Sequence, residues 1–235
     1  MVKQQINTLI DNLNFPESPA FDSNGNLWCT EIGSGNLVKW DGTKVQRFHA
    51  GGKVNGMAFD RYDCIWFTDS ENNLIRYFNS QENDCKNVVD RVDGKPLNRP
   101  NDIAFDWKGN LVVSCHAEAR SEPLGYLMVR TPTKETRKIV GGKFFTNGIA
   151  FHIDQRTLYY SETYNQTVWK AIWDSENAEI KEEIEWIETP GPKGPDGMCL
   201  DSEGNLYITV FDQGIVMVVN PHGDQIEEIR LNAKR

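Results

Sequence analysis

A short motif that recurs five times along the chain constrains its fold more than any other feature of the sequence. The tripeptide Ala-Phe-Asp stands at residues 20–22, 58–60 and 104–106, and altered copies stand at 150–152 and 199–201. A polar turn and then a short apolar run follow each copy. Self-similarity at intervals of 38 to 49 residues indicates a protein built from structural repeats.

Each copy of the motif belongs to a unit of four predicted β-strands. In the first unit the later strands fall at 27–30, 36–40 and 44–48, and in the last unit two of them fall at 214–219 and 225–230. These runs are rich in β-branched and aromatic residues, Gly, Asn and Asp separate them, and no helical periodicity appears. Four strands in each ~40 to 50 residues are typical of a propeller blade. We therefore predict an all-β protein, a β-propeller of four-stranded blades, with residues 1–235 as a single domain.

The sequence leaves the number of blades open. Residues 5–10 have the pattern of a fourth strand, with no first three strands before them. Propellers commonly complete one blade from both chain ends, which removes the exposed edges of the sheets. Here the last residue, Arg235, directly follows a fourth strand. We therefore expect either a five-bladed ring or a ring without its sixth blade.

Composition excludes several functional classes. The chain has 34 acidic and 25 basic residues, a net charge of -9, and no basic stripe that would bind nucleic acid. No run approaches the ~18 apolar residues of a membrane-spanning helix. The N-terminus also lacks the apolar core of a signal peptide, so we expect a cytoplasmic protein without membrane partners. The cysteines are scattered and form no CxxC pair, which predicts buried, reduced thiols; they are Cys29, Cys64, Cys85, Cys115 and Cys199.

An oxygen-bearing side chain precedes each copy of the repeated motif by three residues. These five residues are Glu17, Asn55, Asn101, Asn147 and Asp196. Because the first strand of each blade lines the central channel, we expect them to face one another. Such a ring suits a hard divalent cation, Ca²⁺ first and Mg²⁺ or Mn²⁺ next, although some hard-oxygen sites accept Fe²⁺ or Zn²⁺. The alternative is that these residues merely open turns, which explains Asn and Asp but does not predict Glu17.

Four segments carry a resemblance to a known family. Residues 15–21, 98–102, 146–151 and 195–201 resemble, in order, motifs of the senescence-marker-protein, gluconolactonase and luciferin-regenerating-enzyme family. The resemblance covers essentially the whole chain. It implies a six-bladed propeller with a divalent metal in its channel, and sugar-lactone hydrolysis, which many members perform. In two departures, the family's Glu-Gly-Pro reads Glu17-Ser18-Pro19 here, and the segment that starts the sixth blade is absent.

The resemblance also implies roles for individual residues. Matching motifs make Glu17, Asn101, Asn147 and Asp196 the metal ligands, and Asp196 would also act as base or nucleophile. Arg99 is similar to an arginine that contacts substrate oxygens, although a salt bridge between blades is the alternative.

Three further residues are candidates by position. Asn55 belongs to the ring of oxygen donors, so we expect it to contact substrate or water, as Asn101 could also do. His116 and Glu118 follow a strand on a loop over the channel mouth. Contact with substrate is one interpretation of these two residues, and a solvated loop is the other.

Together these features predict a metal-dependent hydrolase that opens a small, sugar-type lactone to its hydroxy acid. A channel cation would polarise the carbonyl and stabilise the oxyanion, while Asp196 takes a proton from water or attacks directly. The alternatives are an ester or organophosphate hydrolase on the same site, or a non-catalytic calcium-binding or interaction propeller. The expected partner is a small lactone or ester, and the sequence does not decide between monomer and dimer.

Overall fold

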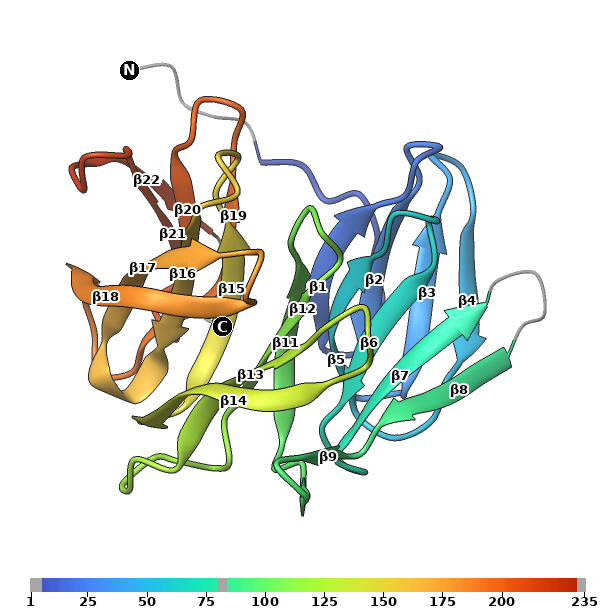
Figure 1. Ribbon diagram of the computed structural model, residues 1–235. Helices are drawn as coiled ribbons and strands as arrows, with labels where there is room; N and C mark the ends of the chain where they lie inside the picture. Colours follow the sequence, from blue (N-terminus) through green and yellow to red (C-terminus); the bar gives the residue numbers. More distant parts are fainter. Residues whose placement is uncertain (1–5, 80–83, 232–235) are drawn as a thin grey trace.

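The computed structural model describes residues 6–79 and 84–231, and it confirms the β-propeller. Five four-stranded antiparallel sheets follow one another around a central axis, and in each sheet the strands are paired in sequence order (Figure 1). The first blade contains β1 (Pro16–Phe21), β2 (Leu27–Glu31), β3 (Asn36–Trp40) and β4 (Val45–His49). The second contains β5 (Val54–Phe59), β6 (Ile65–Asp69), β7 (Leu74–Asn79) and β8 (Asp84–Val89).

The remaining three blades repeat this plan. A small hairpin, β9 (Arg91–Val92) and β10 (Lys95–Pro96), precedes the third blade, which contains β11 (Pro100–Phe105), β12 (Leu111–Cys115), β13 (Gly125–Arg130) and β14 (Thr136–Lys143). The fourth contains β15 (Thr146–Phe151), β16 (Thr157–Glu162), β17 (Thr167–Asp174) and β18 (Glu179–Glu188), with a 3₁₀ turn at Thr163–Asn165. The fifth contains β19 (Gly194–Leu200), β20 (Leu206–Phe211), β21 (Ile215–Val219) and β22 (Gln225–Arg230).

The aspartate of the repeated motif stabilises the turn that connects the first strand of a blade to the second. One carboxylate oxygen of Asp22 accepts hydrogen bonds from the backbone N–H groups of Asn24 and Asn26, and the other accepts the indole N–H of Trp28 at 3.0 Å. Asp60 binds its own turn and Trp66 in the same way. Such Asx turns satisfy backbone donors that the strands leave unpaired, so the motif fixes the hairpin locally.

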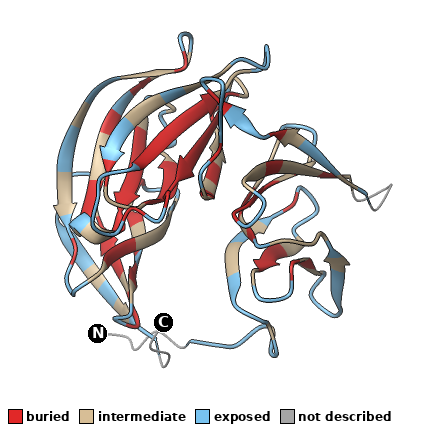
Figure 2. Cartoon of the chain, turned by 90° about the horizontal axis from the view of Figure 1, so that it is seen from below, coloured by how far each residue is buried: buried red, intermediate tan, exposed pale blue. Residues whose placement is uncertain are grey.

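The core lies between blades. Four clusters of buried apolar side chains occupy the junctions of blades one and two, two and three, three and four, and four and five. At the first junction Trp28 stacks on Phe48, with ring centroids 5.5 Å apart, and meets the edge of Phe78. Figure 2 shows the same distribution, with buried residues where blades face each other and exposed residues along the outer strands.

The inner strands β1, β5, β11, β15 and β19 lie side by side in that order, whereas β19 does not lie alongside β1. The expected strand at residues 5–10 is wrong for the described residues 6–10, which have no strand structure. A strand forms only where a neighbouring backbone offers hydrogen bonds, and among residues 6–79 and 84–231 no strand pairs with this segment. Gln5 lies outside the described residues.

All five cysteines are free, as expected, but only Cys29 and Cys115 are buried. The expectation of buried thiols is therefore wrong for Cys199, which is exposed, and for the half-buried Cys64 and Cys85. Cys199 faces away from the apolar junction of blades four and five, because neighbouring residues of a strand point to opposite faces. In the described part of the chain, no helix has the length and apolar character needed to cross a membrane.

Candidate functional site

Each inner strand carries an irregularity at its oxygen donor. The register of β1 against β2 shifts between Glu17 and Ala20, and the register of β15 against β16 shifts between Thr146 and Ile149. The other three inner strands shift at the same place. Bulges re-aim side chains and are common beside functional sites, so this recurring bulge turns the five donors toward the axis.

A strained residue precedes most of these bulges by the same distance. Phe15, Arg99 and Phe145 stand two residues before their donors and have φ values of 57°, 54° and 62°. Left-handed conformations of bulky residues cost about 1–3 kcal/mol each and persist where the surrounding structure enforces them. Gly194 holds the equivalent place before Asp196, with φ of 105°. Left-handed backbone therefore stands two residues before four of the five oxygen donors.

Hydroxyl groups on the second strands attach the donors to neighbouring blades. Thr30 donates to the backbone carbonyls of Glu17, in its own blade, and of Asn55, in the next. Thr68 donates to the carbonyl of Asn101, and Ser161 to that of Asp196 at 2.9 Å. This role was not predicted from the sequence, although a signal for it is present there. A hydroxyl residue ends the apolar run in every repeat, at Thr30, Thr68, Ser114, Ser161 and Thr209.

Between the third and fourth blades, Asp102 makes the corresponding link. Its carboxylate accepts the backbone N–H of Ile149 in the fourth blade at 2.8 Å and that of Ile103 in its own strand. Thr146 adds a hydrogen bond from its hydroxyl to the carbonyl of Cys115. Asp102 therefore fixes the distance between the neighbouring donors Asn101 and Asn147.

The five oxygen donors lie between two cavities and line both of them; we call this ring of five side chains the central level. Glu17, Asn55, Asn101, Asn147 and Asp196 line an upper cavity of about 370 Å³ and a lower cavity of about 520 Å³. The structure therefore brings all five predicted ring residues together. Above them the upper cavity has an aromatic rim of Phe15, Phe145, Tyr164 and Phe211, and polar groups that include His116 and Thr163.

The carboxylates of this level perturb one another. The pKa of Glu17 is raised to about 8, first by burial and then by the negative charges of Asp196 and Asp102. Burial also raises the pKa of Asp102 to about 6 and that of Asp196 to about 6. Hydrogen bonds from the Asn147 side chain and the Gly197 backbone N–H oppose the shift at Asp196 and orient its carboxylate. Acidic groups gathered in this way favour a cation among them.

The donor set fits a hard divalent cation. Two carboxylates and two amide oxygens, from Glu17, Asp196, Asn101 and Asn147, are the ligand types that Ca²⁺ prefers. Among residues 6–79 and 84–231, no three His, Cys, Asp or Glu side chains are grouped to hold a metal, so a site here depends on the amide oxygens as well. The identity of the ion stays a prediction.

Glu118 lines the upper cavity, and Arg99 lies beside Glu118 without lining the cavity itself. The Arg99 guanidinium donates to the carbonyl of Ser70 at 3.0 Å and lies 4.0 Å from the carboxylate of Glu118. Glu118, with a side chain 52% exposed, lines the cavity and also pairs with Arg120 at 3.3 Å. His116, by contrast, is only 6% exposed. The alternative of a solvated loop is therefore wrong for His116.

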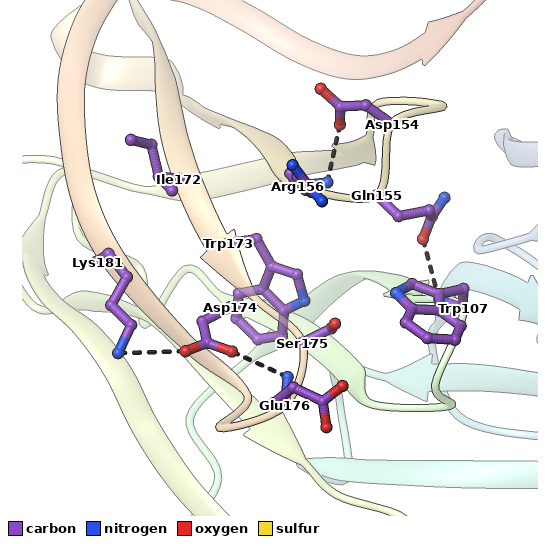
Figure 3. A pocket seen from close by; sticks show the side chains of 10 residues that line it. All are labelled: Trp107, Asp154, Gln155, Arg156, Ile172, Trp173, Asp174, Ser175, Glu176 and Lys181. Atoms are coloured by element: carbon purple, nitrogen blue, oxygen red, sulfur yellow. Dashed lines mark hydrogen bonds and ion pairs between the residues drawn. The ribbon is translucent and has the colours of Figure 1, made fainter.

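A larger depression of about 600 Å³ lies away from this level (Figure 3). Asp154 and Asp174 contribute to its lining, but they accept hydrogen bonds from their own turns, and Asp174 also pairs with Lys181 at 3.2 Å. Its exposed Trp107 is joined to Gln155 through a backbone N–H. These groups connect the ends of blades three and four and leave no free carboxylate for chemistry.

Fold and site together define a class: a β-propeller whose inner strands gather hard oxygen donors at the centre. The signature of the SMP-30/gluconolactonase/LRE-like region family matches residues 15–235, and the chain belongs to this family.

Known relatives agree with that assignment. The chain is 26% identical over 225 residues to lactonase drp35 of Staphylococcus aureus, covering 91% of this chain and 69% of that protein. It superposes on the gluconolactonase XC5397 of Xanthomonas campestris with a TM-score of 0.84, at 22% identity over 97% of this chain and 80% of that one. The calcium-binding regucalcin of Agrobacterium tumefaciens gives a TM-score of 0.84 at 18% identity, over 96% and 78%. The chain spans between 51% and 69% of the length of the first curated relatives that it matches.

Proposed function

We propose that this protein is a metal-dependent lactonase, which adds water to a small, sugar-type lactone and releases the open hydroxy acid. The supporting observation is the convergence of Glu17, Asn101, Asn147 and Asp196 on one level beneath a cavity. Family membership and the similarity to a staphylococcal lactonase support the reaction class. The neighbouring structure of a calcium-binding regucalcin supports Ca²⁺ as the ion.

The residues of the central level would hold the cation and position the reactants. When bound there, a divalent cation polarises the lactone carbonyl and neutralises negative charge on its oxygen. Asp196, oriented by Asn147 and Gly197, accepts a proton from the attacking water. Water adds to the carbonyl carbon, the ring C–O bond breaks, and the proton passes to the departing oxygen. Asn55 lines the same level and offers an amide to substrate or water.

Substitution of Asp196 tests this proposal. The rate of acid release from a panel of aldonolactones and δ-valerolactone would be measured by pH-stat titration with Ca²⁺ present. We expect Asp196→Asn to lower kcat/KM by about 10²-fold or more, because it removes both the proton acceptor and a ligand charge.

Asp201→Asn is a matched control from the same blade. The Asp201 carboxylate accepts hydrogen bonds from its own turn, at Glu203 and Asn205, and does not line either cavity, so this variant should keep near-normal turnover. Wild-type protein that binds Ca²⁺ and melts cooperatively but hydrolyses no lactone would contradict the proposal. Turnover of phosphotriesters or simple esters alone would move the assignment to another leaving group.

A further inference from the structure

His116 occupies an enclosed position at the upper cavity. It directly follows β12 and lines the same cavity as Asn101 and Asp196. Its ring stacks on Phe145, with centroids 4.2 Å apart and planes 20° apart. Phe145 in turn meets the edge of Tyr164. The aromatic rim therefore holds the imidazole in a fixed plane.

The hydrogen bonds of His116 fix its tautomer. The backbone N–H of Glu118 donates to Nδ1 at 3.1 Å, so Nδ1 is an acceptor and the neutral ring carries its proton on Nε2. In the part of the chain that the structure describes, Nε2 has no hydrogen-bond partner. The neutral ring thus presents an N–H donor to the cavity and has no free lone pair, so it can donate a hydrogen bond but cannot act as a base.

The backbone maintains this orientation at a cost. Ala117 and Glu118 both adopt left-handed conformations, with φ of 53° and 52°, which cost roughly 1–2 kcal/mol each for residues other than glycine. The His116 N–H donates to the carbonyl of Arg99 at 3.0 Å, and its carbonyl accepts the N–H of Ala119 at 2.9 Å. Strain of this kind is characteristic of functional loops.

The surroundings keep the ring uncharged. Burial lowers the pKa of His116 to about 4; the carboxylate of Glu118 opposes this shift, and the guanidinium groups of Arg99 and Arg120 add to it. The imidazole is therefore neutral at pH 7. A neutral imidazole N–H can polarise a carbonyl group by donating a hydrogen bond to its oxygen.

We propose that His116 contacts the substrate, and that its Nε2–H donates a hydrogen bond to the carbonyl oxygen of the lactone as that oxygen gains negative charge. This inference rests on the proposed function. It adds a donor from the third blade, supplied by the chain itself, to the groups that stabilise the tetrahedral state. The proton remains on Nε2 throughout, so His116 takes no part in the proton transfers of the reaction.

Two substitutions distinguish the role of Nδ1 from the role of Nε2. In His116→Asn the amide oxygen takes the place of Nδ1, so the bond from Glu118 can remain while the donor to the cavity is lost. In His116→Gln a donor remains near the place of Nε2. We expect His116→Asn to lower kcat/KM for the best lactone by about 10²-fold, the usual effect of removing one oxyanion donor, and His116→Gln to recover at least tenfold of that loss.

A matched control comes from His152. Its Nδ1 accepts the backbone N–H of Asp154, two residues on, which is the same local arrangement, but this residue does not line the upper cavity. His152→Asn should therefore keep wild-type kinetics. The affinity for Ca²⁺, measured by calorimetry, should be unchanged in all three variants, which excludes a general disturbance of the site.

A second measurement does not depend on turnover. In protein with ¹⁵N-labelled histidine, the Nε2–H signal of His116 should shift when δ-valerolactam, a cyclic carbonyl compound that resists hydrolysis, is added with Ca²⁺. Equal kcat/KM for His116→Asn and wild type, with no shift of this signal, would overturn the inference and leave the lactonase proposal intact. Absence of lactone turnover in wild type would instead overturn the proposed function, and the lactam shift would then decide the role of His116.

Discussion

The residue after an oxygen donor controls how closely two blades approach. Gly148 follows Asn147, and a Cβ atom there would lie 2.3 Å from the carbonyl oxygen of Asp196. Gly56 follows Asn55 and meets the backbone at Asn101 in the same way, with 2.4 Å to its carbonyl oxygen. These glycines are needed because the backbone that carries the next donor occupies the space of a side chain.

Gly148→Ala should therefore damage both stability and the site. We expect a loss of about 1–3 kcal/mol, because the clash is with rigid backbone, and weaker binding of Ca²⁺ through the displaced Asp196. Thermal melts and calorimetric Ca²⁺ titrations would measure the two effects. Gly141→Ala is the control, because nothing lies within 4 Å of a Cβ at that position. Equal effects of the two substitutions would contradict this account of the blade contact.

The raised pKa of Glu17 predicts a specific pH dependence of stability. A carboxyl whose folded pKa is raised contributes stability that is fully present below its unfolded pKa, near 4.5, and is lost as pH rises through its folded pKa, about 8. The melting temperature of metal-free protein should thus fall between pH 5 and pH 8.5. In Glu17→Gln, which cannot ionise, the fall should be smaller by several degrees.

Calorimetric melts in chelator across this range would test the prediction. Ca²⁺ should raise the melting temperature of wild type most at the high-pH end, because its ligands must be deprotonated to bind. The same pH dependence of the melting temperature in wild type and Glu17→Gln would contradict a raised pKa of Glu17.

At the scale of the strand, hydroxyl groups connect the hairpins of neighbouring blades. Thr68 is fully buried, accepts the backbone N–H of Gly56 at 2.9 Å, and donates to the carbonyl of Asn101. The hydroxyl thus satisfies two backbone groups that the bulge removes from the ladder between strands. It also fixes the backbone of a donor residue from the neighbouring blade.

Thr68→Val should cost about 1–3 kcal/mol, because it leaves buried polar groups without partners while keeping the side-chain volume. Thr68→Ser, which keeps the hydroxyl, should cost less. Thr209→Val is the matched control from the fifth blade, since the exposed Thr209 donates within its own blade, to the carbonyl of Gly197 on β19. Chemical denaturation would rank the variants, and an equal loss for Thr209→Val and Thr68→Val would contradict a link between blades.

These elements also show how far sequence can predict such a molecule. The blades were predictable because Asp22 and its counterparts fix each hairpin through local hydrogen bonds. The five donors were predictable because they keep register with that motif. The enclosure of His116 was not, since it depends on left-handed Ala117 and Glu118 and on stacking with Phe145, which is distant in sequence. The expected strand failed for residues 6–10, because strand propensity has no effect without a pairing partner and the described part of the chain offers them none.

At the scale of the whole molecule, the proposed cation would join the first and fifth blades, whose inner strands do not lie side by side. Its ligands come from the first blade at Glu17, the third and fourth at Asn101 and Asn147, and the fifth at Asp196. Because β1 and β19 do not lie side by side, a shared ion would be the direct connection between those two strands. Metal binding and the geometry for catalysis are therefore expected to be inseparable.

The most direct test of this account is to measure Ca²⁺ binding and lactone hydrolysis in one titration of metal-free protein. Heat of binding and acid release would be followed on the same preparation as free Ca²⁺ is raised. We predict that turnover is absent in chelator and rises in proportion to the fraction of sites filled, with one ion per chain. Turnover at full rate in chelator, or one bound Ca²⁺ with no turnover of any lactone, would contradict a metal-dependent lactonase.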